Sequence, residues 1–198
     1  TGFYAATDGA ASRTTQRMIT VDPHLERSSG AWNHRIQGRY LKLVNDVNNN
    51  QGNASSTWQT EYRSRYRTEG WTATAGLYAQ GTRSIAELYA AGVGDSVHNA
   101  GNRAAYLQID AQPHERLHLT AGGRYEHFVV DSVSQGKSVF RAGINYRFGQ
   151  ASFLRASIGQ GFRFPSIAEK FIQTSVGGIN VFPSFDIRPE SSTNMEIG

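Results

Sequence analysis

A strict alternation of apolar and polar side chains constrains this chain more than any other feature. Within residues 137–148, Phe140 and Ile144 fall on one side of an extended chain, and Arg141 and Asn145 fall on the other. Successive side chains of a β-strand point to opposite faces, so this period of two predicts a strand with one apolar and one polar face. The same pattern predicts further strands at 12–21, 32–44, 57–68, 70–80, 103–111, 115–131 and 152–160.

The connections between these segments are predicted to alternate between short and long. The expected tight turns are 68–70, 112–114 with Pro113, and 149–150, and the expected longer polar links are 45–56, 81–102, 132–136 and 161–193. Short turns on one side and longer loops on the other are typical of transmembrane β-barrels. We therefore expect an all-β fold, an antiparallel transmembrane β-barrel segment of about eight or nine up-and-down strands.

Composition excludes several other classes of protein. No run of 18 or more apolar residues is present, as a membrane helix would require, whereas a barrel strand needs only about 9–11 residues of alternating character. The absence of cysteine excludes disulfide scaffolds and thiol chemistry. The net charge of +4 raises the question of nucleic acid, but basic residues recur at alternate strand positions rather than in a patch, so no nucleic-acid partner is expected.

The polar side of the predicted sheet carries many charges, which indicates a wide barrel. The expected lumen-wall residues are Arg63, Arg65, Arg67, Arg124, Glu126, Arg141, Arg147 and Arg155. A small closed barrel fills its interior with compact side chains, so these charges favour a wide lumen filled by another domain. They are expected to solvate the wall or pair with that domain, rather than to attract an anionic substrate. Aromatic girdles are expected at Trp32, Trp58, Trp71, Phe128, Phe148 and Phe162.

The last fifty residues hold the most specific motif. A Gly-Gln-Gly-Phe-Arg-Phe-Pro run covers 159–165, and an Ile-Arg-Pro-Glu-Ser run follows at 187–191. This order resembles the barrel of TonB-dependent outer-membrane receptors, in which a Gly-Phe-Arg-x-Pro element precedes a short loop helix and a Pro-Glu-Ser/Thr element opens the next strand. Residues 122–128 resemble the family as well, and 39–41 with the Asn-rich loop after them resemble Bacteroidota members. The resemblance covers the chain from about residue 30, but Ser-Phe at 184–185 replaces a frequent Asn-Pro.

The resemblance marks a set of motif residues at the rim of the barrel. They are Gly159, Gly161, Phe162, Arg163, Pro165, Glu169, Arg188, Pro189 and Glu190. Pro165 suits the first turn of a helix, where a missing N–H costs little. Arg163 and Glu190 are charges at loop bases, able to pair with each other or with a plug. A structural or plug-facing role is favoured over ligand contact for all of them.

The resemblance further implies a 22-stranded barrel with a plugged lumen. Residues 1–198 would form somewhat under half of it, without the plug domain, the TonB-binding segment and the closing strands. Family members bind a scarce solute, such as a ferric siderophore, haem, cobalamin or a glycan, at extracellular loops and import it with energy from TonB. The implied partners are the TonB complex, the receptor's own plug, a surface lipoprotein, an unidentified small ligand and the bacterial outer membrane.

No enzyme, cofactor or metal site is expected. The glycines near residue 160 lack the spacing of a nucleotide loop, and no Gly-x-Ser-x-Gly element is present. Two alternatives stay open. A passive porin needs the same alternation without plug or TonB segment, and a soluble sugar-binding β-sandwich would need long loops at both ends and distinct packing roles for both sheet faces.

Overall fold

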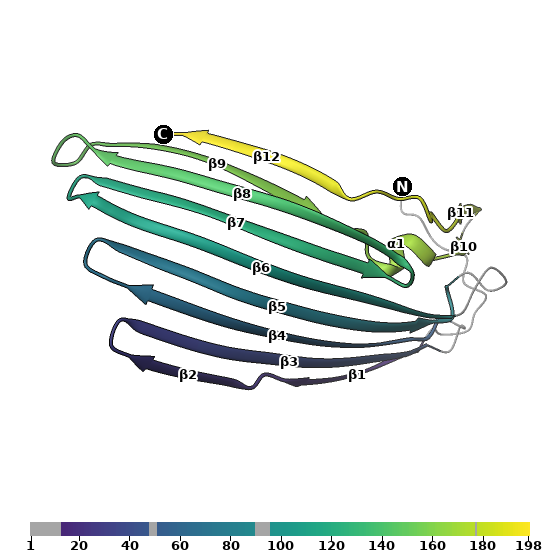
Figure 1. Ribbon diagram of the computed structural model, residues 1–198. Helices are drawn as coiled ribbons and strands as arrows, with labels where there is room; N and C mark the ends of the chain where they lie inside the picture. Colours follow the sequence, from purple (N-terminus) through teal and green to yellow (C-terminus); the bar gives the residue numbers. More distant parts are fainter. Residues whose placement is uncertain (1–12, 48–50, 90–95, 177) are drawn as a thin grey trace.

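The alternating segments form long neighbouring strands of one curved antiparallel sheet (Figure 1). The computed structural model describes residues 13–47, 51–89, 96–176 and 178–198. The sheet contains β1 (Thr14–Val21), β2 (His24–Ser29), β3 (Trp32–Val47), β4 (Asn53–Arg67), β5 (Trp71–Ala86), β6 (Val97–His114), β7 (Leu117–Val130), β8 (Val133–Arg147), β9 (Phe153–Arg163) and β12 (Glu190–Ile197). The strand order β1-β3-β4-β5-β6-β7-β8-β9-β12, with β2 beside β3, is up-and-down and confirms the expected fold class.

The link between β9 and β12 carries the remaining elements. It holds the helix α1 (Ile167–Phe171) and a hairpin of β10 (Thr174–Val176) and β11 (Ile179–Val181). These elements lie at the end of the sheet opposite the short turns (Figure 1). Among the described residues, no helix is long and apolar enough to cross a membrane. The sheet does not close on itself within this fragment, since β12 and the β1–β2 pair form opposite edges.

Several strands run well beyond their predicted ends. β3, β4, β5, β6 and β8 contain between 15 and 18 residues each, because segments that were expected in the long links continue the ladders, whereas β7 is slightly shorter than predicted. The prediction of a longer polar link at 132–136 is wrong. β8 starts at Val133, and only Asp131 and Ser132 separate it from β7. Asp131 has a φ of 50°, the left-handed conformation that such a tight hairpin requires. One of the links on the loop side is therefore as short as those on the turn side.

Proline positions differ from expectation as well. Pro113 lies inside β6, at a register shift between Ala111 and His114, and the turn falls at residues 115–116 instead of 112–114. A bulge accommodates a residue that has no N–H to donate.

The sequence did not predict β2, although β1 and β2 both pair with β3 on either side of Pro23. The link expected as a two-residue turn at 149–150 spans residues 148–152.

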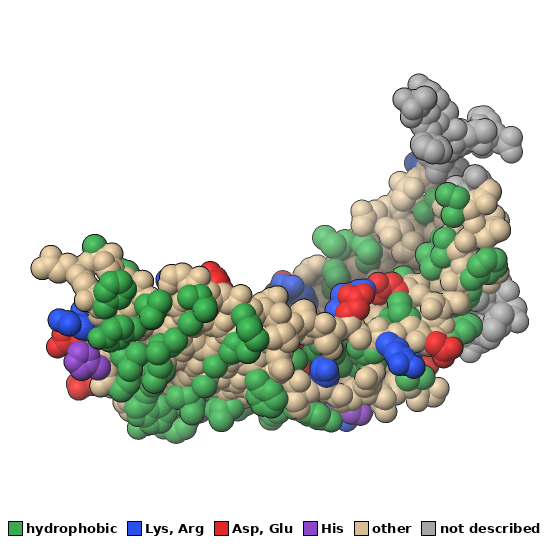
Figure 2. Space-filling model, turned by 90° about the horizontal axis from the view of Figure 1, so that it is seen from above, with side chains coloured by type: hydrophobic (Ala, Val, Ile, Leu, Met, Phe, Trp, Pro, Cys, Tyr) green, Lys and Arg blue, Asp and Glu red, His purple; other side chains and the backbone are tan. Residues whose placement is uncertain are grey.

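Strand pairing places the two kinds of side chain on opposite faces, as predicted. Leu107 lies across from Ala75 and Gly123, and Gly123 lies across from Phe140, so these residues share one side, which we call the apolar face. Gln108, the next residue of β6, shares the other side, the polar face, with its neighbours across the sheet. Leu107 is 51% exposed and Phe140 is 62% exposed. Figure 2 shows hydrophobic side chains gathered toward the end of the molecule that carries the short turns.

Aromatic rings cover several strand glycines. The ring of Tyr106 lies against Gly76, where an added Cβ would meet its Cζ at 2.3 Å, and the Trp58 indole lies against Gly81 in the same way. Phe140 similarly covers Gly123. Each aromatic is the cross-strand partner of its glycine. Such pairs cover backbone that a glycine leaves bare and help to set the register of the strands.

A small packed cluster underlies α1 and contains most of the buried apolar side chains of the described residues. Ala86, Tyr89, Val130 and Ile167 are buried there, with Ala100, Phe164 and Phe171 packed against them. The rest of the sheet is a single layer. A single layer with one exposed apolar face needs an apolar surrounding, and this cluster is too small to supply it.

Candidate functional site

The polar face carries a hydrogen-bonded network at its centre. The Glu61 carboxylate accepts hydrogen bonds from the Tyr106 hydroxyl at 2.5 Å and from Gln37 Nε2 at 2.8 Å. Arg124 donates to Glu126, and its guanidinium lies 5.6 Å from the centre of the Tyr106 ring. The network joins β3, β4, β6 and β7 and so positions charged groups on one wall.

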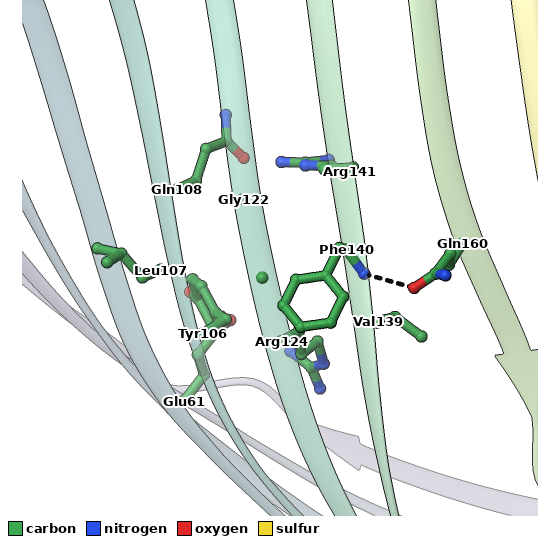
Figure 3. A pocket seen from close by; sticks show the side chains of 11 residues that line it. Glu61, Tyr106, Leu107, Gln108, Gly122, Arg124, Val139, Phe140, Arg141 and Gln160 are labelled. Atoms are coloured by element: carbon green, nitrogen blue, oxygen red, sulfur yellow. Dashed lines mark hydrogen bonds between the residues drawn. The ribbon is translucent and has the colours of Figure 1, made fainter.

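A hollow of about 350 Å³ adjoins this network (Figure 3). It forms where Gly122 and Gly123 leave β7 without side chains. Arg124 and Arg141 line it from the polar face, and Gln160 reaches it from β9 to accept a hydrogen bond from the Phe140 N–H at 3.2 Å. A second hollow of about 470 Å³ lies beside it, over Gly143 and Gly159. The sheet is therefore indented where glycines replace larger residues, and Leu107, Gly123 and Phe140 of the apolar face also line the first hollow.

All eight predicted lumen-wall residues lie on the polar face. Register partners connect them across the sheet, for example Arg65 to Thr74, Gln108, Gly122 and Arg141 in successive strands. Arg124 is paired with Glu126. The other six predicted arginines have no carboxylate oxygen within 4 Å in the described part of the chain; they are Arg63, Arg65, Arg67, Arg141, Arg147 and Arg155. The Nε of Arg63 is buried without a hydrogen-bond partner.

At the loop end, Arg163 joins three segments through its guanidinium. One nitrogen, Nη1, donates to both carboxylate oxygens of Glu169 in α1, at 2.7 and 2.9 Å. Nη2 donates to Glu190, the first residue of β12, at 2.9 Å, and Nε donates to the same carboxylate at 3.3 Å. The expected pairing of Arg163 with Glu190 is therefore present, and Glu169 is a third member of what we call the rim latch.

Local sequence explains why the latch forms. Ser166 caps α1: its hydroxyl accepts the Glu169 N–H, and the Glu169 carboxylate accepts the Ser166 N–H, which is a capping box. The sequence predicted Pro165 in the first helical turn. In the structure, Pro165 instead precedes the cap residue Ser166. The backbone N–H of Ser166 and then the Arg163 guanidinium lower the pKa of Glu169 to about 2. The carboxylate is thus ionised over the whole ordinary pH range.

An aromatic seat holds α1 on the polar face. The buried imidazole of His98 stacks on Phe171, with ring centres 3.6 Å apart, and its Nδ1 lies 2.8 Å from Asp131 Oδ2. Phe128 stacks on Phe164 at 4.8 Å and meets Phe162 edge-on at 5.2 Å. Phe128 and Phe162 therefore pack against other protein side chains, so the prediction that they belong to an aromatic girdle is wrong. Sequence reasoning missed His98, because its partners Tyr89, Asp131 and Phe171 come from three separate segments.

The remaining motif residues lie around the latch. Gly159 and Gly161 are on β9, where Gly159 lines the second hollow and an added Cβ at Gly161 would lie 2.9 Å from Ser192 Oγ. Arg188 and Pro189 line a hollow of about 420 Å³ with Phe162. Arg188 has no ion pair within the described ranges. No group of three or more His, Asp or Glu side chains among the described residues could hold a metal ion.

A broad antiparallel sheet with an exposed apolar face, a charged opposite face and strands of up to 18 residues defines the wall of an outer-membrane β-barrel. The family model "TonB dependent receptor-like, beta-barrel" matches residues 1–198, so the chain belongs to this family of Gram-negative outer-membrane proteins.

Solved structures agree with this assignment at the level of the fold. The chain is similar to the siderophore receptor PirA from Pseudomonas aeruginosa (TM-score 0.78, 16% identity, covering 93% of this chain and 36% of that one). It is also similar to the copper transporter OprC (0.74, 17%, 96% and 37%). A third match is the ferric yersiniabactin uptake receptor FyuA from Yersinia pestis (0.65, 16%, 95% and 34%). No curated protein matches the chain. The chain thus spans about a third of each structure, and its expected Bacteroidota affiliation stays a prediction.

Proposed function

We propose that this chain is part of an outer-membrane receptor that binds a scarce solute at its extracellular loops and imports it with energy supplied through TonB. The observation that carries the proposal is the family match over residues 1–198. The family is one of receptors and transporters rather than enzymes. We include as partners the TonB complex, the receptor's own plug domain and a surface lipoprotein that delivers the solute.

Among solutes, a ferric siderophore is the first candidate, ahead of copper, haem, cobalamin or a glycan. Two of the three similar structures are a siderophore receptor and a ferric yersiniabactin uptake receptor, and the third is a copper transporter.

The proposal includes a plug inside a barrel of 22 strands. Six arginines of the polar face lack a carboxylate within 4 Å in the described part of the chain. Arg141, one of these arginines, lines both the hollow at Gly122 and the hollow over Gly143 and Gly159, which leave room for another chain to approach the strand backbone. A plug that carries acidic groups would pair with these arginines and fill these hollows.

Uptake by intact cells tests this function. Cells with and without the full-length receptor gene would be given ⁵⁵Fe-labelled siderophores, copper, haem, cobalamin and a glycan in turn, each at limiting concentration. We expect one solute to accumulate only in receptor-bearing cells, and to stop accumulating when TonB is deleted or the proton gradient is dissipated. Binding at 4 °C should persist under both treatments.

The same measurement separates the passive porin. Uptake that continues without TonB and without a proton gradient would establish passive diffusion and contradict the proposal. Equal accumulation of every solute with and without the receptor would also contradict it. Deletion of the plug domain from the full-length receptor is the matched control, because it should convert saturable, energy-dependent uptake into unsaturable leakage.

A further inference from the structure

Cations occur on the apolar face: Arg27 of β2 lies near the short turns, and further cations gather at one level along the strands. Four of them, Arg17, Lys42, Arg83 and Arg103, form what we call the cation row. Register pairing puts each of them on the side of the sheet that carries the exposed aromatic and aliphatic residues, and all four are exposed. They come from β1, β3, β5 and β6, so the row crosses much of the sheet.

The level of the cation row matches the outer edge of the membrane. Counted from the turn end of its own strand, Lys42 lies ten residues along β3, Arg83 twelve along β5 and Arg103 eleven along β6. Ten to twelve residues at ~3.3 Å each, on strands tilted by ~40°, rise by about 25–30 Å. Since the apolar band of an outer-membrane barrel is about 25 Å tall, the cation row lies at its extracellular boundary.

Aromatic neighbours mark the same boundary. Lys42 and Arg83 lie in one register row. The next row on the same face, toward the short turns, contains Tyr40, Trp58 and Gly81. Tyrosine and tryptophan gather where headgroups meet hydrocarbon, because their rings are apolar and carry one polar atom. The long side chains of Lys42 and Arg83 can therefore cover the last apolar surface and place their charges among the headgroups.

The cation row has no protein anion to neutralise it in the part of the chain that the structure describes. No carboxylate oxygen of a described residue lies within 4 Å of any of its four members. Pairing places the strand carboxylates on the polar face, as with Glu61, Asp110 and Glu126. The exception is Asp46 at the far end of β3, four residues beyond Lys42.

We propose that the cation row binds phosphate groups of lipid headgroups in the outer leaflet of the outer membrane. A cation on the lipid-facing side of a barrel is strongly unfavourable at the bilayer centre and costs almost nothing at the interface. The level of the cation row is therefore compatible only with contact to headgroups. Arg and Lys both bind phosphate, Arg through paired N–H groups and Lys as a point charge. A membrane lipid is favoured over a protein partner because the surface directly below the row faces hydrocarbon. This inference needs the membrane location alone and does not rest on solute import.

Lipid binding by the purified full-length receptor tests the proposal. The probes are lipid A with its phosphates and the same lipid after enzymatic removal of the phosphates, and bound lipid is counted by native mass spectrometry. We expect wild type to retain the phosphorylated form preferentially. The triple variant Lys42→Gln, Arg83→Gln, Arg103→Gln should lose this preference by about tenfold or more.

The control variant removes the same charge from the polar face, as Arg63→Gln, Arg65→Gln, Arg67→Gln, and should keep the wild-type preference. Heat-dependent gel mobility verifies that each barrel is folded, and single substitutions replace any triple variant that does not fold. Equal retention by wild type and the cation-row variant, or equal loss in both triple variants, would overturn the proposal. Displacement of the lipid by inorganic phosphate would show a site for free anions and would overturn it as well.

Discussion

At the scale of single residues, Arg163 is the joint between β9, α1 and β12. Its guanidinium is shared by the Glu169 and Glu190 carboxylates. All three side chains are partly open to solvent, so screening weakens each pair, but the three-way geometry ties both ends of the 164–189 link to the strand that precedes it. Order in this link should therefore depend on one residue.

We expect Arg163→Gln to loosen the 164–189 link without unfolding the barrel. In outer-membrane vesicles bearing the full-length receptor, protease cleavage within this link should become about two- to fivefold faster. Arg188→Gln, which removes a charge from the same link where the described residues show no ion pair, is the matched control and should leave the rate unchanged. Equal rates in wild type and Arg163→Gln would contradict the latch.

Glu169 gives the latch a defined pH dependence. Its pKa is lowered from 4.5 to about 2, so its stabilising contribution is fully present above pH 4.5 and is lost as the pH falls through about 2. Hydrogen exchange of the 164–172 amides, corrected for intrinsic rates and referenced to β6, should show constant protection from pH 7 to pH 5. It should fall only below about pH 4.

Glu169→Gln is the control for this pH profile. Glutamine can still accept the Ser166 N–H but carries no charge, so the low-pH loss of protection should disappear. A wild-type profile that loses protection between pH 6 and pH 5, or one that the glutamine variant reproduces, would show that another group controls the link.

Gly76 makes room for the central network of the polar face. A Cβ at this position would overlap the Tyr106 ring, whose hydroxyl binds Glu61. We expect Gly76→Ala to destabilise the full-length receptor by about 1–3 kcal/mol, as overpacking does. Equilibrium urea unfolding in lipid vesicles measures this. Gly101→Ala is the control, since its nearest neighbour would be Gln80 O at an ordinary 3.7 Å. Equal stability of the two variants would contradict the overlap.

At the scale of elements, β6 shows how one strand separates two environments. Leu107 lies on the apolar face between the short turns and the cation row, and Gln108 beside it donates to Asp110 on the polar face. Strand geometry makes this separation unavoidable, because a shift of one residue would exchange the two faces.

We expect an arginine to be tolerated on one side of β6 and not on the other. Leu107→Arg should cost the folded barrel about 2–4 kcal/mol, because it places a charge in hydrocarbon. Gln108→Arg should be close to neutral, since Asp110 is there to receive it. Urea unfolding of both variants in lipid vesicles gives the comparison, and similar costs would contradict a lipid contact for the apolar face.

Sequence predicted the strands and their faces better than it predicted their ends. The period of two was sufficient for β4 to β9, because exposed apolar residues have to alternate with polar ones on a single-layer sheet. The ends were missed where polar residues such as Asn53, Ser84 and Asn99 continue the ladders beyond the membrane, since nothing there enforces alternation. β2 was missed because Pro23 breaks its continuity with β1.

The rim was only partly predictable from sequence. The motif identified Arg163 and Glu190, whose separation in sequence hides a short distance in space. The capping box explains Glu169 locally, but the His98 and Phe171 stack depends on β6, β7 and α1 meeting, which only the fold brings about. Contacts between distant segments carry no periodic signal in the chain.

At the scale of the whole molecule, the described sheet is the wall of a larger barrel. Similar structures are about three times as long, since this chain covers 34 to 37% of each. In the proposed receptor, one face contacts lipid and the other faces the lumen, and the cation row marks where the hydrocarbon of the membrane ends. The absence of cysteine from the 198 residues makes this division open to direct measurement.

The most direct test places single cysteines at 104–109 in a cysteine-free full-length receptor in lipid vesicles. Each cysteine carries a spin label, and its collisions with oxygen, which concentrates in lipid, and with a water-soluble nickel chelate are measured. We predict strict alternation, with oxygen collisions dominant at 105, 107 and 109 and weak at 104, 106 and 108. A soluble β-sandwich has neither face in lipid. Chelate collisions of equal strength at all six positions would therefore contradict the account.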